Sequence, residues 1–181
     1  DLYVSPIALG WNFRNSKITW SYGFYAPVGQ YDATDLNNSG LGFWTNQMQL
    51  GGAYYLNNKN YVKKHSTTFM GNLTYEYNNP QRDTSVTPGS YLTLDWGIGQ
   101  YVTSNIELAM VGYFQKQITS DKLPSDSQVP NQRSEAQAVG CEVTGWWGRQ
   151  WKFTGRLLYE YEAKARQAGY LGTFNFSYRP R

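Results

Sequence analysis

The 181-residue chain has little chemistry of the kinds that enzymes and metalloproteins use. It contains a single cysteine, Cys141, and a single histidine, His65. One cysteine excludes a disulfide framework and a cysteine-based zinc cluster. One histidine leaves few ways to build a multi-histidine metal site or a nucleophile–histidine pair. We therefore expect no catalytic residue, no metal and no cofactor.

Long apolar runs and a strong net charge are also missing. The mean hydropathy of -0.61 and the lack of an apolar run exclude a transmembrane helix, although they leave open a transmembrane β-barrel. The 16 Lys and Arg against 13 Asp and Glu are too balanced and scattered for a nucleic-acid partner. Aromatic residues, in contrast, make up 17% of the chain. The length predicts one domain, residues 1–181.

Apolar and polar residues alternate along most of the chain, which is typical of β-strands. In 18–26, for example, Ile18, Trp20, Tyr22 and Phe24 alternate with small or polar residues. The pattern predicts nine strands and no amphipathic helix, and Pro6 makes the first strand irregular or an edge. The predicted strands are 2–11, 18–26, 44–56, 69–77, 91–102, 106–115, 136–147, 151–161 and 170–178.

Short and long connections between these strands follow one another in turn. The short ones are 12–16, 57–60, 103–105 and 148–150, and the long ones are 27–42, 78–89 and 119–133. Only the connection 163–167 breaks the pattern, because its length is modest at a place where a long loop is expected. Long loops at one end and tight turns at the other are typical of outer-membrane barrels.

Three features favour a transmembrane barrel over a soluble one such as a lipocalin. The strands have the length that crosses a bilayer at a tilt, about 9–11 residues. Aromatic residues gather near both strand ends, such as Trp151 beside a short turn and Tyr159 nearer a long loop. Charged strand residues fall on the face without aromatic residues, where they avoid lipid. The sequence thus predicts an all-β, transmembrane antiparallel β-barrel.

The charged residues on that polar face are the candidate lumen-lining or constriction residues. Two interpretations stay open: a polar constriction that selects solutes, or inward salt bridges that fill the barrel. Cys141 is expected on the lipid face with Val139 and Val143, and His65 in a solvated segment. The five candidate residues are Glu76, Asp95, Glu107, Arg156 and Glu160.

Nine strands conflict with the even strand number of bacterial single-chain barrels, which brings both termini to the periplasmic side. Either 2–11 is not a strand, or further strands precede Asp1. We favour the second explanation. The chain begins at Asp1 without an initiator methionine or a signal peptide, so we expect it to be either processed or only part of the mature protein.

Several segments, in order and spacing, resemble one known family over essentially the whole chain. They include Pro27-Val28-Gly29-Gln30-Tyr31-Asp32, Glu76-Tyr77-Asn78-Asn79-Pro80, Leu94-Asp95-Trp96 and 160–169 (EYEAKARQAG). The family is the outer-membrane β-barrel family of meta-pathway phenol-degradation proteins. The resemblance implies a barrel of about twelve strands, of which this chain holds part. It also implies passage of aromatic or other apolar compounds. Val86 and Ala165 depart from the family pattern, and both lie in predicted loops.

The expected function is passive passage of small apolar or aromatic compounds through a bacterial outer membrane. We expect short turns on the periplasmic side, long loops outside, and outer-membrane lipid and lipopolysaccharide as partners. The alternative is a structural barrel that anchors or accompanies a larger surface assembly with partner proteins. An enzyme ranks third, because His65 is predicted at the end opposite the long loops.

Overall fold

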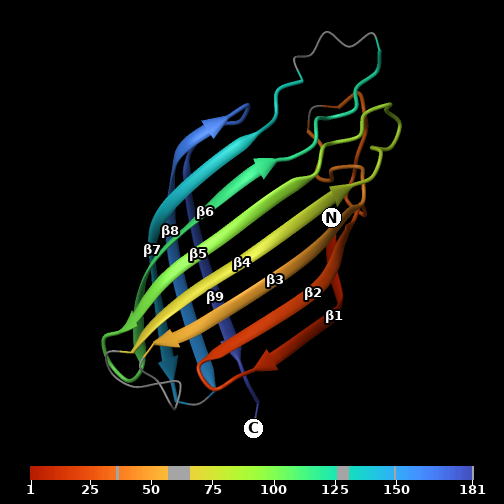
Figure 1. Cartoon of the computed structure of the whole chain (residues 1–181). Coiled ribbons are helices and arrows are strands. Elements are labelled where there is room, and N and C mark those ends of the chain that lie inside the picture. The colour runs from red at the N-terminus through yellow and green to blue at the C-terminus, as the bar shows by residue number, and fades with distance from the viewer. Residues whose placement is uncertain (36, 57–65, 126–130, 149, 181) are drawn as a thin grey trace.

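The structure, a computed structural model, consists of nine β-strands (Figure 1). It describes residues 1–181 except 36, 57–65, 126–130, 149 and 181. All nine predicted strands are present, and 2–11 is confirmed as a strand. No helix long and apolar enough to cross a membrane occurs within these described residues. The strands are β1 (Leu2–Asn12), β2 (Ser16–Ala26), β3 (Thr45–Leu56), β4 (Thr67–Asn78), β5 (Tyr91–Tyr101), β6 (Ile106–Gln117), β7 (Glu135–Trp147), β8 (Trp151–Lys164) and β9 (Tyr170–Tyr178).

The strands form one antiparallel sheet in which each strand pairs with the next one along the chain. The sheet curls strongly, so that β7, β8 and β9 run behind β2 to β5 in the view of Figure 1. β1 and β9 pair on one side only, and the described sheet is therefore open rather than closed on itself. The predicted all-β antiparallel architecture is confirmed, whereas closure into a barrel stays a prediction.

Connections of different length lie at opposite ends of the sheet (Figure 1). One end, called the long-loop end, carries 27–44, 79–90, 118–134 and 165–169. The other, called the short-turn end, carries 13–15, 102–105 and 148–150 as well as the β3–β4 connection. The predicted segregation of loop length is confirmed except at two connections, since β3–β4 spans 57–66 at the short-turn end and 165–169 is short at the long-loop end. The predicted turn at 57–60 and His65 lie outside the described residues.

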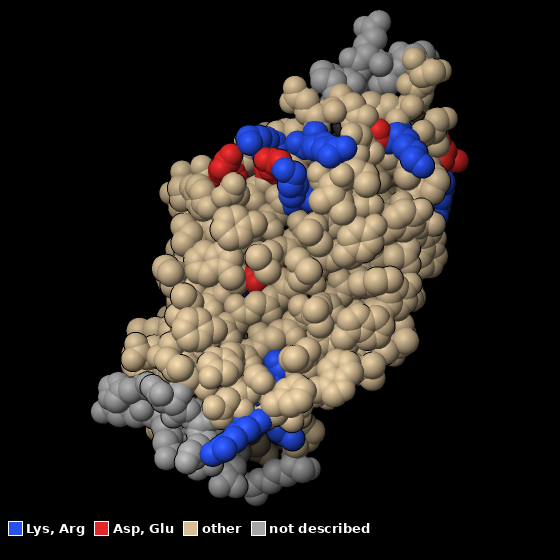
Figure 2. Space-filling view, viewed as in Figure 1, with Lys and Arg blue, Asp and Glu red and all other residues tan. Residues whose placement is uncertain are grey.

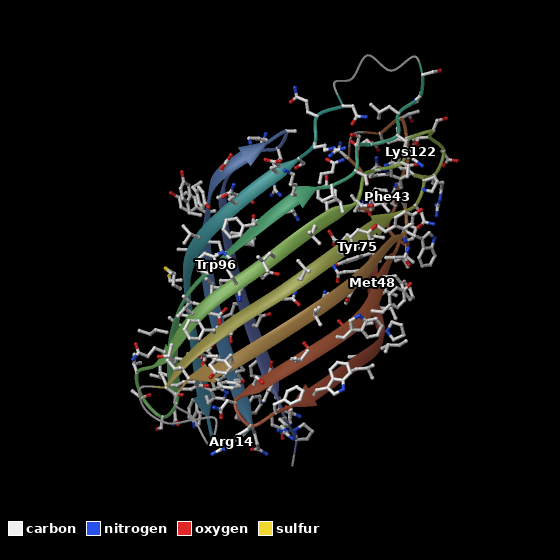
Figure 3. The ribbon with its side chains drawn as sticks, viewed as in Figure 1. Arg14, Phe43, Met48, Tyr75, Trp96 and Lys122 are labelled. Atoms are coloured by element: carbon white, nitrogen blue, oxygen red, sulfur yellow. The ribbon has the colours of Figure 1, made fainter. Side chains whose placement is uncertain are left out.

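Period-two alternation gives the sheet two chemically different faces. The inner face, on the concave side, carries a small buried cluster of Ala109, Val111, Ala138 and Leu158. The outer face, on the convex side, exposes large apolar side chains along every strand. Figure 3 shows three outer-face side chains along the strands, with Arg14 at the short-turn end and Phe43 and Lys122 at the long-loop end. The three are Met48 and Tyr75, which are exposed, and Trp96, which is half-buried.

Charged residues on the outer face of β6, β7 and β8 lie at the long-loop end. Lys116, Glu135 and Lys164 stand opposite one another across these three strands. Glu135 forms ion pairs with Lys116 at 2.8 Å and with Lys164 at 3.1 Å. Figure 2 shows red and blue residues gathered toward the long-loop end and blue residues toward the short-turn end, with only small coloured spots in the tan surface between them.

Two irregularities change the register between neighbouring strands. The pairing of β1 with β2 shifts between Val4 and Ile7, at the predicted Pro6 irregularity. Proline lacks the N–H that a regular ladder requires, so it is accommodated where the pairing is interrupted. A second shift lies between Gln137 and Ala138, opposite Tyr161.

The loop 27–44 is fastened to the start of β1. The Asp1 carboxylate accepts hydrogen bonds from the Gly29 amide at 3.1 Å and the Leu41 amide at 2.9 Å. Within the loop, the hydroxyl and the amide of Thr34 both donate to Asp32. These bonds favour the carboxylate form and lower the pKa of Asp32. The loop is therefore held by local hydrogen bonds rather than by an apolar core.

The close approach of β7 and β8 predicts different costs at two glycines. A Cβ at Gly140 would overlap the Leu157 carbonyl oxygen, whereas a Cβ at Gly155 would meet nothing within 4 Å. We expect Gly140→Val to lower the free energy of unfolding by about 1–3 kcal/mol. The matched Gly155→Val should change it by less than about 0.5 kcal/mol. Urea unfolding in detergent micelles or vesicles measures both, and equal effects would contradict the described packing.

Candidate functional site

The five candidate residues all lie on the inner face. β4 supplies Glu76, β5 supplies Asp95, β6 supplies Glu107, and β8 supplies Arg156 and Glu160. Glu107 and Glu160 are buried, and the other three are half-buried. The alternation thus brings them to one side of the sheet as predicted. Their partners divide them into two groups.

Arg156 forms a close pair with Glu142, which stands directly opposite on β7. Its Nε and Nη2 atoms both lie 2.7 Å from Glu142 Oε2. The Glu142 side chain is only 12% exposed, so the pair lies in a region of reduced screening. Arg156 therefore has a structural partner on the inner face.

Glu160 is the centre of a denser group near the long-loop end. Its Oε1 accepts hydrogen bonds from the Tyr113 hydroxyl and, at 2.9 Å, from Arg166 Nη2. Its Oε2 accepts one from the Gly169 amide at 3.1 Å. Arg166 also donates to Gln115 Oε1 at 2.8 Å. Both oxygens of the Glu160 carboxylate are thus engaged, and they hold the 165–169 loop against the inner face.

Glu107 lies toward the short-turn end, opposite Tyr101 on β5. Neighbouring Gly99 provides its space, since a Cβ there would come within 2.5 Å of Glu107 Oε1. Lys152 lies nearby at the same end, with its Nζ 5.8 Å from the centre of the Trp146 ring. This glycine therefore makes room for an inward carboxylate.

Glu76, Asp95 and Glu107 differ from Arg156 and Glu160. Within the part of the chain that the structure describes, none of the three forms an ion pair, and only Glu107 among them is buried. Glu76 accepts a hydrogen bond from Gln47 Nε2 at 2.9 Å. Asp95 lines a small cavity of about 130 Å³ that Arg156 also borders. Because Glu76 and Asp95 are only half-buried, they are the unpaired carboxylates that a solute can reach.

Sequence reasoning missed Glu142, Tyr113 and Arg166 as members of the inner face. The signal for Glu142 was present, because it follows Cys141, which the alternation assigns to the outer face. Nothing in the pattern could identify Arg166, because it comes from a loop. Among the described residues, no group of three or more His, Cys, Asp or Glu side chains is placed to hold a metal ion.

Fold and site together define an up-and-down antiparallel sheet protein with a polar, charge-bearing inner face and an apolar outer face. Its relationship to known proteins is shown by a family model. The model described as "Putative MetA-pathway of phenol degradation" matches residues 1–176, and the chain belongs to this family. The family resemblance in the sequence is therefore confirmed. No curated protein and no solved structure matches the chain.

Removing the Glu142 carboxylate should destabilise the protein, because it leaves the Arg156 guanidinium without its ion-pair partner. We expect Glu142→Gln to cost about 1–2 kcal/mol, a value reduced by the partial exposure of Arg156. Glu162→Gln is the matched control, since its pair with Lys164 is well exposed and worth less than about 0.5 kcal/mol. Equal midpoints of urea unfolding for the two variants would contradict the assignment.

Proposed function

We propose that this chain belongs to a β-barrel in a bacterial outer membrane and that the barrel passes small apolar or aromatic compounds passively. The observation that carries the proposal is the separation of the two faces. The outer face exposes Leu50, Leu94 and Leu157, whereas the inner face holds the four candidate carboxylates and Arg156. In water this arrangement would leave a large apolar surface exposed, but in a bilayer the same surface meets lipid.

Strand length and aromatic placement support the same proposal. The strands run from 9 residues in β9 to 14 in β8, which suffices to cross a bilayer at a tilt. Aromatic residues are exposed at both ends, for example Trp147 at the short-turn end and Tyr170 at the long-loop end. Such rings prefer the two membrane interfaces. The family description, which refers to phenol degradation, is compatible with an aromatic solute.

The free edges of β1 and β9 require closure in a bilayer, because unpaired backbone groups are costly there. We propose that further strands bridge these edges and complete a barrel of about twelve. A barrel of this size lies between a filled eight-stranded interior and an open porin channel. The lumen is then narrow, and its width depends on the inner side chains.

In this arrangement the short turns face the periplasm and the long loops face the exterior. The outer face contacts outer-membrane lipid, and the charged residues at the long-loop end meet lipopolysaccharide. We propose no catalytic step and no cofactor, since passage down a gradient needs neither.

A structural barrel that anchors a larger surface assembly is the alternative. The observation in its favour is the pairing of inner charges, since Arg156 is bound to Glu142 and Glu160 to Arg166. Paired groups of this kind can fill a lumen without any solute. Solute flux distinguishes the two functions.

The position of Cys141 provides a direct test of the lipid-facing surface. It is the single cysteine of the chain, it is exposed, and it lies in the middle of β7. A nitroxide spin label on Cys141 in vesicles should collide with oxygen and not with a water-soluble nickel complex. A label at position 142, introduced as Glu142→Cys with Cys141→Ser, should show the reverse preference. Electron paramagnetic resonance measures both, and nickel access at Cys141 would exclude a lipid-facing outer side.

The transport function predicts flux through the full-length protein in proteoliposomes. The vesicles should have a low intrinsic permeability, for example because their surface is coated with a long-chain polymer. Toluene and benzyl alcohol should then equilibrate across the membrane at a higher rate when the protein is present than when it is absent. A protein-free vesicle and a vesicle with a filled eight-stranded barrel are the controls. Rates equal to both controls would reject transport and support the anchoring alternative.

A further inference from the structure

Two adjoining cavities lie at the long-loop end of the inner face. They share Glu76 on β4 and Tyr91 on β5, which stand directly opposite each other in the sheet. One cavity, of about 330 Å³, is mainly apolar, and we call it the ring pocket. Besides the two shared residues, the ring pocket is lined by Tyr25, Leu41, Phe43, Thr45, Asn78 and Pro88.

The second cavity, of about 410 Å³, is polar, and we call it the polar pocket. Its lining includes Gln115, Asp121 and Arg166 in addition to the two shared residues. An apolar and a polar compartment thus meet at one carboxylate and one phenol. This arrangement suits a molecule with an apolar body and a polar group at one end.

The wall of the ring pocket is fixed by hydrogen bonds between loops. The Leu41 carbonyl accepts one from Gln81 Nε2 at 2.9 Å, and the Gly42 carbonyl accepts one from the Arg82 amide at 2.8 Å. These bonds hold the segment that carries Phe43, labelled among the loops in Figure 3. A pocket held in this way loses little conformational entropy when a ligand binds.

Most polar groups around the two pockets already have partners inside the protein. Thr45 Oγ1 donates to Asn78 Oδ1 at 2.6 Å, and Asn78 Nδ2 donates to the Gly89 carbonyl at 2.7 Å. Asp121 Oδ1 accepts from the Gly89 amide at 2.7 Å. Arg166 is engaged by Glu160 and Gln115, as described above. Asp121 Oδ1 also accepts a hydrogen bond from Gln117 Nε2 at 2.6 Å, so only its Oδ2 atom takes part in none of these bonds.

Glu76 is the one carboxylate among the described lining residues that borders both pockets, and its hydrogen bond from Gln47 involves only Oε1. A carboxylate has about four acceptor positions, so most of its capacity remains. A hydroxyl or amine donor on a ligand would gain a charge-assisted bond there. A carboxylate on a ligand would instead meet the negative charges of Glu76 and Asp121, while Arg166, which lines the polar pocket, is already paired with Glu160.

We propose that the ring pocket and Glu76 form a binding site for single-ring aromatic compounds that carry a hydrogen-bond donor and no negative charge. The ring lies against Phe43, and the donor points to Glu76. An apolar cavity of about 150 Å³ is large enough for benzene, so the ring pocket can hold one substituted ring. This site rests on the proposed function, in which it is the point where solutes are selected at the outer mouth of the barrel.

Three ligands with the same carbon skeleton test the site directly. Benzyl alcohol has a ring and a donor, toluene has only the ring, and benzoate has the ring and a negative charge at pH 7.5. Isothermal titration with the full-length protein in detergent should show benzyl alcohol binding about tenfold more tightly than toluene. Benzoate should bind more weakly than either. Benzoate binding as tightly as benzyl alcohol would overturn the proposal.

Variants separate the carboxylate from the pocket wall. Glu76→Gln should weaken benzyl alcohol by about threefold and strengthen benzoate by about fivefold, because the charge is lost while an acceptor remains. Phe43→Ala should weaken benzyl alcohol and toluene alike, by about tenfold. Glu162→Gln, which removes the same charge elsewhere, should change none of the three. An unchanged ratio of benzoate to benzyl alcohol in Glu76→Gln would overturn the role of Glu76.

Binding and flux report on different proposals. Selective binding without flux in proteoliposomes would leave the site intact and reject transport. Flux without the binding preference would leave transport intact and reject the site. Far-UV circular dichroism and unfolding midpoints identify any variant that fails to fold, and the gain of benzoate affinity in Glu76→Gln cannot come from a misfolded protein.

Discussion

The strict two-residue alternation of the strands is the constraint on which the rest of the structure depends. In the middle of the sheet it sends charge to one side and large apolar side chains to the other, and outer-face charges such as Glu135 lie at the long-loop end. Because a one-residue slip would exchange the two faces completely, each strand is fixed in register with its neighbours. Where the register does shift, at Val4–Ile7 and Gln137–Ala138, the shift lies toward the long-loop end. The middle of the sheet keeps both faces uniform.

The inner face shows how charge is tolerated on a curled sheet. Glycine occupies positions where a neighbouring inner-face side chain needs space, as Gly99 does next to Glu107. Charges are then paired locally, as in Arg156 with Glu142. Both devices reduce the cost of holding ions away from bulk water. They support the salt-bridge interpretation for Arg156 and Glu160, and they leave Glu76 and Asp95 as the residues that a solute can reach.

Much of the site could be predicted because alternation alone assigns a strand residue to a face. Glu76, Asp95, Glu107, Arg156 and Glu160 were all found in this way. The partners were harder to predict, since they depend on which residues stand opposite one another. Arg166 reaches Glu160 from a loop, and loop conformation has no periodic signal. The two pockets at the long-loop end were not predictable for the same reason, because loops from distant parts of the sequence build their walls.

The bulge in β8 shows most clearly what lay beyond the sequence pattern. Simple alternation places Tyr161 and Glu162 on opposite faces, yet the Tyr161 hydroxyl and the Glu162 carboxylate both bond to Gln137. The sequence by itself determined the strands, their faces and the unequal ends, since these follow from local periodicity and turn chemistry. Only the tertiary structure decided the pairing of charges, the position of the bulge and the shape of the pockets. These features depend on contacts across strands and loops, whose geometry no local pattern contains.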